Sequence, residues 1–120
     1  MDNNFKLILS INDLSNESGG PSKALLSLSS HLISKGVDFR LIAKELSKLN
    51  PTYQKLSPLI LQYQSQLRIS YKNFIVENKL LNLLENMHID YPHTVVHDHG
   101  IWLPSNNTIC SFARKKRLKL

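Results

Sequence analysis

The order of apolar and polar residues in the first third of the chain limits its fold most narrowly. The apolar run Phe5–Ile11 predicts a buried strand, and a loop rich in Asn, Ser and Gly follows it. Apolar residues then recur at helical spacing up to Gly36, which suits a left-handed helix end, and Val37–Ala43 has the pattern of a second strand. Strand, helix and strand within about 40 residues indicate a βαβ unit with parallel strands and a right-handed crossover.

The middle of the chain is less regular, and an α/β pattern returns near its end. A polar segment with two prolines follows the second strand, and Leu59–Met87 is predicted to be helical because its leucines form an apolar stripe. Thr94–His97 is short and β-branched, as expected of a third buried strand. A helix is predicted over residues 105–118, with Ser105 or Asn106 as its cap.

Composition indicates one compact domain. Apolar residues make up 42% and charged residues 20% of the 120 residues, which is typical of a globular protein. No run of about 18 apolar residues occurs, so we expect no transmembrane helix, and the N-terminus lacks the features of a secretory signal. Cys110 is the only cysteine, so no intrachain disulfide can form and a reducing cytosol is the expected compartment.

The net charge of +6 is concentrated at one end of the chain. Five basic residues lie among the last seven, and the remaining chain carries about +1. They are Arg114, Lys115, Lys116, Arg117 and Lys119. The simpler interpretation is a solvated helix end whose cations complement the helix dipole. Nucleic-acid binding is the alternative, and it is weakened because no aromatic residue is interleaved with these cations.

The loop before the first helix is a candidate anion site. Gly19 and Gly20 allow close approach of a ligand to the backbone, and the helix N-terminus that follows favours a phosphate. The loop also follows the carboxyl end of a strand, where open α/β sheets bind ligands. Its pattern is neither a dinucleotide fingerprint nor a P-loop. From the residues alone, a turn that needs glycine is an equally good explanation.

A second polar segment follows the third predicted strand. His97 and His99 flank Asp98, and these groups can hydrogen-bond sugar hydroxyls or move protons, while Trp102 can stack on a sugar ring. The two histidines would share one face of a strand, as metal ligands can, but no third ligand has convincing spacing. A structural role, with His97 in the core and Trp102 packed beside it, is the other interpretation.

Together, three segments of the chain resemble the start of a family-4 (group 1) retaining glycosyltransferase. They are Gly19–Leu25, Leu32–Phe39 and Val95–Trp102, in that order. The resemblance implies an α/β fold with a Rossmann-like parallel sheet, as in the incomplete N-terminal domain of a GT-B enzyme. Residues 1–120 would form this acceptor-side domain, and the donor domain would be absent.

The resemblance also implies roles for the two loops. Gly19 and Gly20 would approach the donor diphosphate, and His97, His99 and Trp102 would lie on the acceptor side. In such enzymes catalysis generally needs no metal, so the expected ligands are the nucleotide sugar and the acceptor, with no further cofactor. No catalytic residue is assigned.

The full-length form would transfer a hexose from a nucleotide sugar to a glycan or lipid-linked acceptor in polysaccharide or lipopolysaccharide biosynthesis. We expect the chain alone to be inactive, because the absent domain would stabilise the leaving diphosphate. A stand-alone acceptor-binding or regulatory module that pairs with a separate donor domain is the alternative. The expected partners are a sugar acceptor and, through the missing domain, the nucleotide sugar, and not nucleic acid. We expect a cytoplasmic protein. Peripheral attachment to the cytoplasmic face of the membrane is the alternative location.

Overall fold

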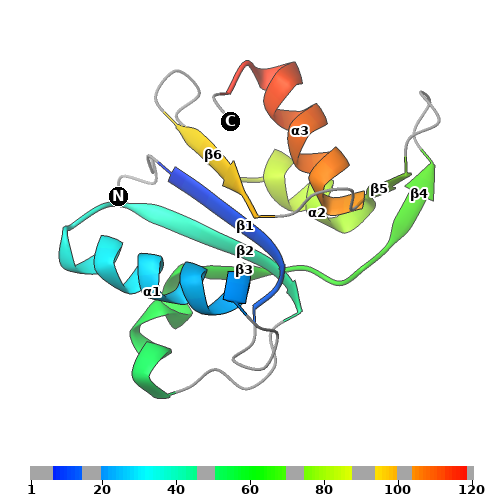
Figure 1. Ribbon diagram of the computed structural model, residues 1–120. Coiled ribbons are helices and arrows are strands. Elements are labelled where there is room, and N and C mark those ends of the chain that lie inside the picture. Colours follow the sequence, from blue (N-terminus) through cyan, green and yellow to red (C-terminus); the bar gives the residue numbers. More distant parts are fainter. Residues whose placement is uncertain are drawn as a thin grey trace.

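The computed structural model describes residues 7–14, 20–45, 51–69, 75–87, 94–99 and 104–118, which form an α/β fold (Figure 1). Its elements follow in the order β1 (Leu7–Asp13), α1 (Gly20–Ser34), β2 (Phe39–Glu45), the 3-10 helix η1 (Pro51–Leu59), β3 (Ile60–Gln62), β4 (Leu67–Ile69), β5 (Ile75–Glu77), α2 (Asn78–Glu85), β6 (Val95–Asp98) and α3 (Pro104–Lys116).

The main sheet has four parallel strands in the order β3-β2-β1-β6. Strand β1 is central, and its Leu9 lies opposite Leu41 of β2 on one side and His97 of β6 on the other. The chain therefore first builds outward from β1 to β3 and later returns to add β6 on the other side of β1. The parallel α/β architecture that the sequence predicted is confirmed.

The βαβ unit predicted for the first third of the chain is also confirmed. Helix α1 connects β1 to β2, which begins two residues later than predicted. Phe5, the predicted start of the first strand, lies outside the described residues. Gly36 adopts a φ of +74°, which is the left-handed conformation expected at a helix end. Its N–H donates to the Ile33 carbonyl, and the Val37 N–H donates to the Leu32 carbonyl, so α1 ends in a Schellman motif.

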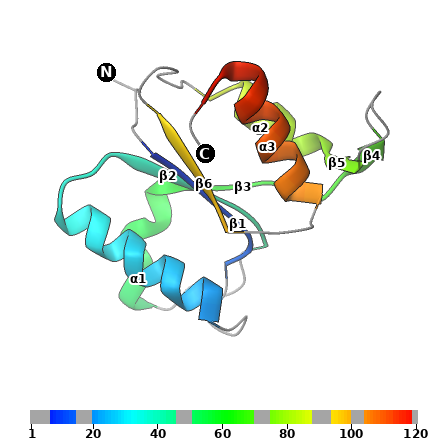
Figure 2. The ribbon, with the colours of Figure 1, turned by 45° about the horizontal axis from the view of Figure 1, so that its top comes forward.

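The two faces of the sheet carry separate cores, with α1 and η1 on one side and α2 and α3 on the other (Figures 1 and 2). Alternate residues of β1 point to opposite faces. Leu9 packs with Leu25 of α1, whereas Ile8 packs with Phe112 of α3. Because β1 is buried on both faces, it appears in the sequence as an almost continuous apolar run.

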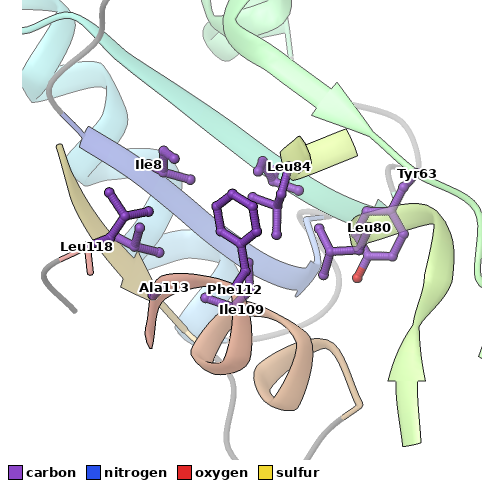
Figure 3. Packing of buried hydrophobic residues seen from close by; sticks show 10 residues of the cluster. Ile8, Tyr63, Leu80, Leu84, Ile109, Phe112, Ala113 and Leu118 are labelled. Atoms are coloured by element: carbon purple, nitrogen blue, oxygen red, sulfur yellow. The ribbon is translucent and has the colours of Figure 1, made fainter. Parts of the chain in front are cut away.

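Phe112 lies in the middle of the core on the α3 side of the sheet (Figure 3). Figure 3 shows Phe112 of α3 beside Leu84 of α2, with Tyr63 at one end of the cluster and Leu118 at the other. These side chains are at most 8% exposed, and they join the end of the chain to its first strand. Ile109, Phe112 and Ala113 therefore form the inward face of α3.

The prediction for Leu59–Met87 is wrong over most of its length. Only Asn78–Glu85 is α-helical, and the rest of the described segment supplies β3 and the antiparallel pair β4 and β5. In that pair, Leu67, Ile69 and Ile75 are exposed, so no buried apolar stripe supports a helix there. β-branched residues in β5 instead favour extended backbone.

The predicted strand and helix near the end of the chain are confirmed as β6 and α3. Helix α3 begins at Pro104, a residue suited to a first helical turn, so the predicted cap Ser105 lies inside the helix. Arg117 ends it with a φ of +59°, and the Leu118 N–H donates to the Ala113 carbonyl. Among the described residues, no helix has both the length and the apolar character needed to cross a bilayer.

Candidate functional site

The polar residues singled out near the end of the chain lie where the winding of the sheet reverses. Strand β1 continues toward α1 on one face of the sheet, whereas its neighbour β6 is followed by α3 on the other face (Figure 2). Open α/β sheets bind ligands at such a switch point, outside the carboxyl ends of the strands. Ser10 of β1 pairs in register with Asp98 of β6 at this point.

The Asp98 carboxylate fastens three elements together. Its Oδ1 accepts a hydrogen bond from Ser10 Oγ at 2.6 Å, and its Oδ2 accepts one from Asn106 Nδ2 at 2.7 Å. Ser10 belongs to β1, Asn106 to the first turn of α3 and Asp98 to the end of β6. Hydrogen bonds to an ionised acceptor are about twice as strong as neutral ones. Asp98 therefore holds the carboxyl end of β6 in place, and both of its oxygens are engaged.

His97 points to the opposite face of β6 from Asp98, because side chains alternate along a strand, and His99 follows directly after β6 with its ring beside that of His97. Their ring centroids are 4.3 Å apart, and the ring planes are inclined by 35°. His97 is exposed, and His99 is half-buried. The His99 N–H donates to the Ser10 carbonyl at 2.8 Å, which fixes the backbone just beyond the strand. The predicted same-face histidine pair is therefore present.

The environment of His99 favours a neutral imidazole. Burial lowers its pKa from the ordinary value, the neighbouring His97 lowers it further, and Asp98 opposes both effects. Its Nε2 is buried and has no hydrogen-bond partner among the described residues. A neutral imidazole has one donor and one acceptor nitrogen, so it can exchange hydrogen bonds with a hydroxyl group without adding a charge.

The structure brings together only part of the predicted site. His97 and His99 are in contact, and Gly20 begins α1 after the loop that follows β1. Gly19 and Trp102 lie outside the described residues. The proposed core role for His97 is wrong, since its side chain is exposed.

A second polar cluster lies between β5 and α3, and it was not predicted. The buried Glu77 carboxylate accepts hydrogen bonds from Ser65 Oγ at 3.0 Å and from the Gln66 N–H at 3.0 Å. The Glu77 N–H donates to Thr108 Oγ1 of α3 at 2.8 Å. This cluster fastens β5 to α3, so its first effect is on the fold.

Tyr63 lies beside that cluster and is only 5% exposed. Burial raises the pKa of its hydroxyl well above the ordinary value, and the carboxylates of Glu77 and Asp98 raise it further, while Ser105 acts in the opposite direction. The hydroxyl forms no well-aligned hydrogen bond with any described residue. Tyr63 is therefore a neutral phenol at physiological pH and cannot serve as a base.

Sequence reasoning missed the partners of Asp98. Ser10 was included in an apolar strand, and Asn106 was interpreted as a helix cap. A signal for Ser10 does exist, because a polar residue inside a fully buried strand needs a hydrogen-bond partner. Asn106 carried no such signal, since asparagine near a helix start usually caps it.

No three His, Cys, Asp or Glu side chains gather at one point in the part of the chain that the structure describes. Comparison of the chain with known protein families, curated proteins and solved structures gives no match.

Proposed function

We propose that this chain is the acceptor-side, Rossmann-like domain of a GT-B glycosyltransferase and that its β1–β6 switch point binds a sugar acceptor. In the full-length form, a hexose would pass from a nucleotide sugar to a glycan or lipid-linked acceptor. The donor domain would supply the charge that stabilises the leaving diphosphate, so we expect the chain alone to have no transferase activity. A cytoplasmic location is part of the proposal and is in keeping with the single Cys110.

One observation carries the proposal: the His97–His99 pair lies beside the central strand at the switch point. The order β3-β2-β1-β6 corresponds to four neighbouring strands of a doubly wound sheet, in which ligands bind beside this first strand. The loops that follow β1 and β6 resemble those of family-4 enzymes, and these two strands are neighbours in the sheet. The sheet order therefore supports the same location.

The residues of the switch point would act by binding and orientation. The exposed His97 would donate to or accept from an acceptor hydroxyl, and the half-buried His99 would hold the His97 ring in place through their ring contact. Asp98 has both oxygens engaged by Ser10 and Asn106, so it would position the histidines and not contact the sugar. Gly20 would place the N-terminus of α1 toward the donor phosphates.

The proposal is tested by sugar binding to the whole chain. We would titrate it with free hexose oligosaccharides and measure affinity by calorimetry. The substitution His97→Ala removes about one hydrogen bond and should lower affinity by about threefold to tenfold. His31→Ala is the matched control, because His31 is also exposed but lies on α1 away from the sheet edge. Equal effects of both substitutions, or no oligosaccharide binding by the unaltered chain, would contradict the proposal.

A further inference from the structure

The β4–β5 pair carries the most exposed large apolar side chains among the described residues. Ile69 is 70% exposed, Leu67 57% and Ile75 48%. Ile69 lies opposite Ile75, and side chains two residues apart along a strand point to the same face, so these three residues share one face of the pair. Val76 points to the opposite face and is buried. One face of the pair is therefore covered, and the other is open.

The hydrogen-bond ladder of this pair fixes which backbone groups point outward. The Asn78 N–H donates to the Gln66 carbonyl at 2.8 Å, so these two residues form a hydrogen-bonded pair. Hydrogen-bonded and non-hydrogen-bonded pairs alternate along an antiparallel ladder, so Arg68 turns its backbone groups toward β5. Leu67 and Ile69 therefore direct their N–H and C=O groups to the outer edge of β4, and no described strand pairs with that edge.

The outer edge of β5, in contrast, is occupied by α3. By the same alternation, Ile75 and Glu77 direct their backbone groups away from β4. Thr108 Oγ1 accepts a hydrogen bond from the Glu77 N–H at 2.8 Å, and Asn107 Nδ2 donates to the Ile75 carbonyl at 3.4 Å. Helix α3 thus protects one edge of the pair, whereas the edge of β4 remains a template for another strand.

We propose that the edge of β4 pairs with the same edge of a second copy of this chain, antiparallel and about a two-fold axis at Arg68. The register is self-complementary, because Leu67 and Ile69 flank Arg68 symmetrically. Each Leu67 then exchanges backbone hydrogen bonds with the partner's Ile69, and their side chains meet on one face. Since α3 covers the outer edge of β5, the assembly closes as a dimer and does not extend into a longer sheet.

Charge opposes this pairing and makes it depend on salt. Arg68 would lie opposite the partner's Arg68, and like charges directly opposite each other destabilise a strand pair. Arg68 Nε donates to Asn78 Oδ1 at 2.6 Å, which draws the side chain toward its own β5 and α2. The net charge of +6 adds repulsion between the two copies. Salt screens both repulsions, so the dimer should be favoured as ionic strength rises.

Strand β4 lies where a second copy can reach it. Figures 1 and 2 both show β4 at the margin of the molecule, away from α1. Pairing through β4 goes beyond sugar binding at the switch point and does not depend on it, because the edge residues belong to a different sheet. Strands of three residues make a contact smaller than the roughly 800 Å² per partner of standard interfaces, so the dimer is weak and forms at high concentration.

Sedimentation velocity of the whole chain tests the proposal. From about 10 µM to about 1 mM protein, we expect a monomer–dimer equilibrium with no larger species, and more dimer in about 0.5 M salt than in about 0.05 M salt. Ile69→Lys places a charge on the edge, and the two-fold axis repeats the change, so dimerisation should weaken by about tenfold or more. Ile69→Val keeps an apolar, β-branched side chain and should dimerise like the unaltered chain.

A second variant and a matched control complete the test. Circular dichroism checks folding, and Ile69→Pro, which removes only an outward N–H, should also weaken the dimer. Val95→Lys is the control, because Val95 is another exposed apolar residue and lies on β6, an edge strand of the main sheet, so this variant should dimerise normally. A monomer at every concentration overturns the proposal. Equal losses in Ile69→Lys and Val95→Lys, a dimer that survives both Ile69→Lys and Ile69→Pro, or species larger than the dimer also overturn it.

Discussion

Replacing Asp98 with asparagine tests the hydrogen bonds that connect β6 to β1 and α3. The side chain keeps its size but loses its charge, and its amide nitrogen must face either Ser10 Oγ or Asn106 Nδ2. The Ser10 hydroxyl can rotate to accept a hydrogen bond from this nitrogen, whereas Asn106 Nδ2 is a donor only. At 2.6 Å and 2.7 Å, the present bonds are short enough to be charge-assisted.

The expected loss of stability follows from these two bonds. A hydrogen bond to a charged group contributes about 1.5–3 kcal/mol, and a neutral one about 1 kcal/mol. Losing the charge assistance on both sides, in a part-buried position, should lower the free energy of unfolding by about 2 kcal/mol. Urea unfolding followed by circular dichroism measures this loss.

The matched control for Asp98 is Asp38→Asn. Asp38 forms an exposed ion pair with Arg40 at 2.9 Å, and its side chain is 48% exposed. Exposed pairs contribute little, so we expect a change below about 0.5 kcal/mol. A double-mutant cycle with Asn106→Ala should then show strong coupling to Asp98. If Asp98→Asn costs no more than Asp38→Asn, Asp98 does not hold the three elements together.

Three further predictions concern single residues. Gly36→Ala should lower the free energy of unfolding by about 1 kcal/mol from backbone strain alone, since an added Cβ meets nothing within 4 Å. Arg117→Gly should raise it by about as much, because it relieves the same strain. Urea midpoints that move in the same direction for both variants would refute this. Tyr63→Phe removes a buried hydroxyl without a well-aligned partner among the described residues, so thermal unfolding should show a change within about 1 kcal/mol, and a larger loss would reveal a hidden partner. Because the pKa of His99 is lowered in the folded state, its contribution to stability is present above pH 6.5 and lost as pH falls through the folded pKa; His99→Gln should flatten this acid-side slope in urea titrations, and an unchanged slope would contradict the assignment.

The first third of the fold could be predicted because each of its signals has one physical cause. A continuous apolar run indicates a strand that is buried on both faces, and β1 is such a strand. Gly36 marked a helix end because a left-handed residue was needed there. The segment with β4 and β5 was mispredicted because its strands are three residues long and β4 is exposed throughout, so the segment shows neither helical nor strand periodicity.

The candidate site could be predicted only in its outline. Adjacent residues of a strand point to opposite faces, so the same-face relation of His97 and His99 followed from their spacing. The hydrogen bond between Asp98 and Ser10 joins residues that are 88 positions apart in sequence, and it depends on β6 lying beside β1. Local pattern does not encode strand order, so this neighbourhood became visible only in the folded sheet.

The most direct test of sugar binding at the switch point is a backbone NMR titration with the oligosaccharide that binds best. We predict that the amide signals of Ser10, Asp98 and His99 shift together as sugar is added. Signals from the β4–β5 pair and from residues 114–117 at the end of α3 should not move. Shifts confined to those distant regions, or no shifts at saturating sugar, would contradict the placement of an acceptor site between β1 and β6.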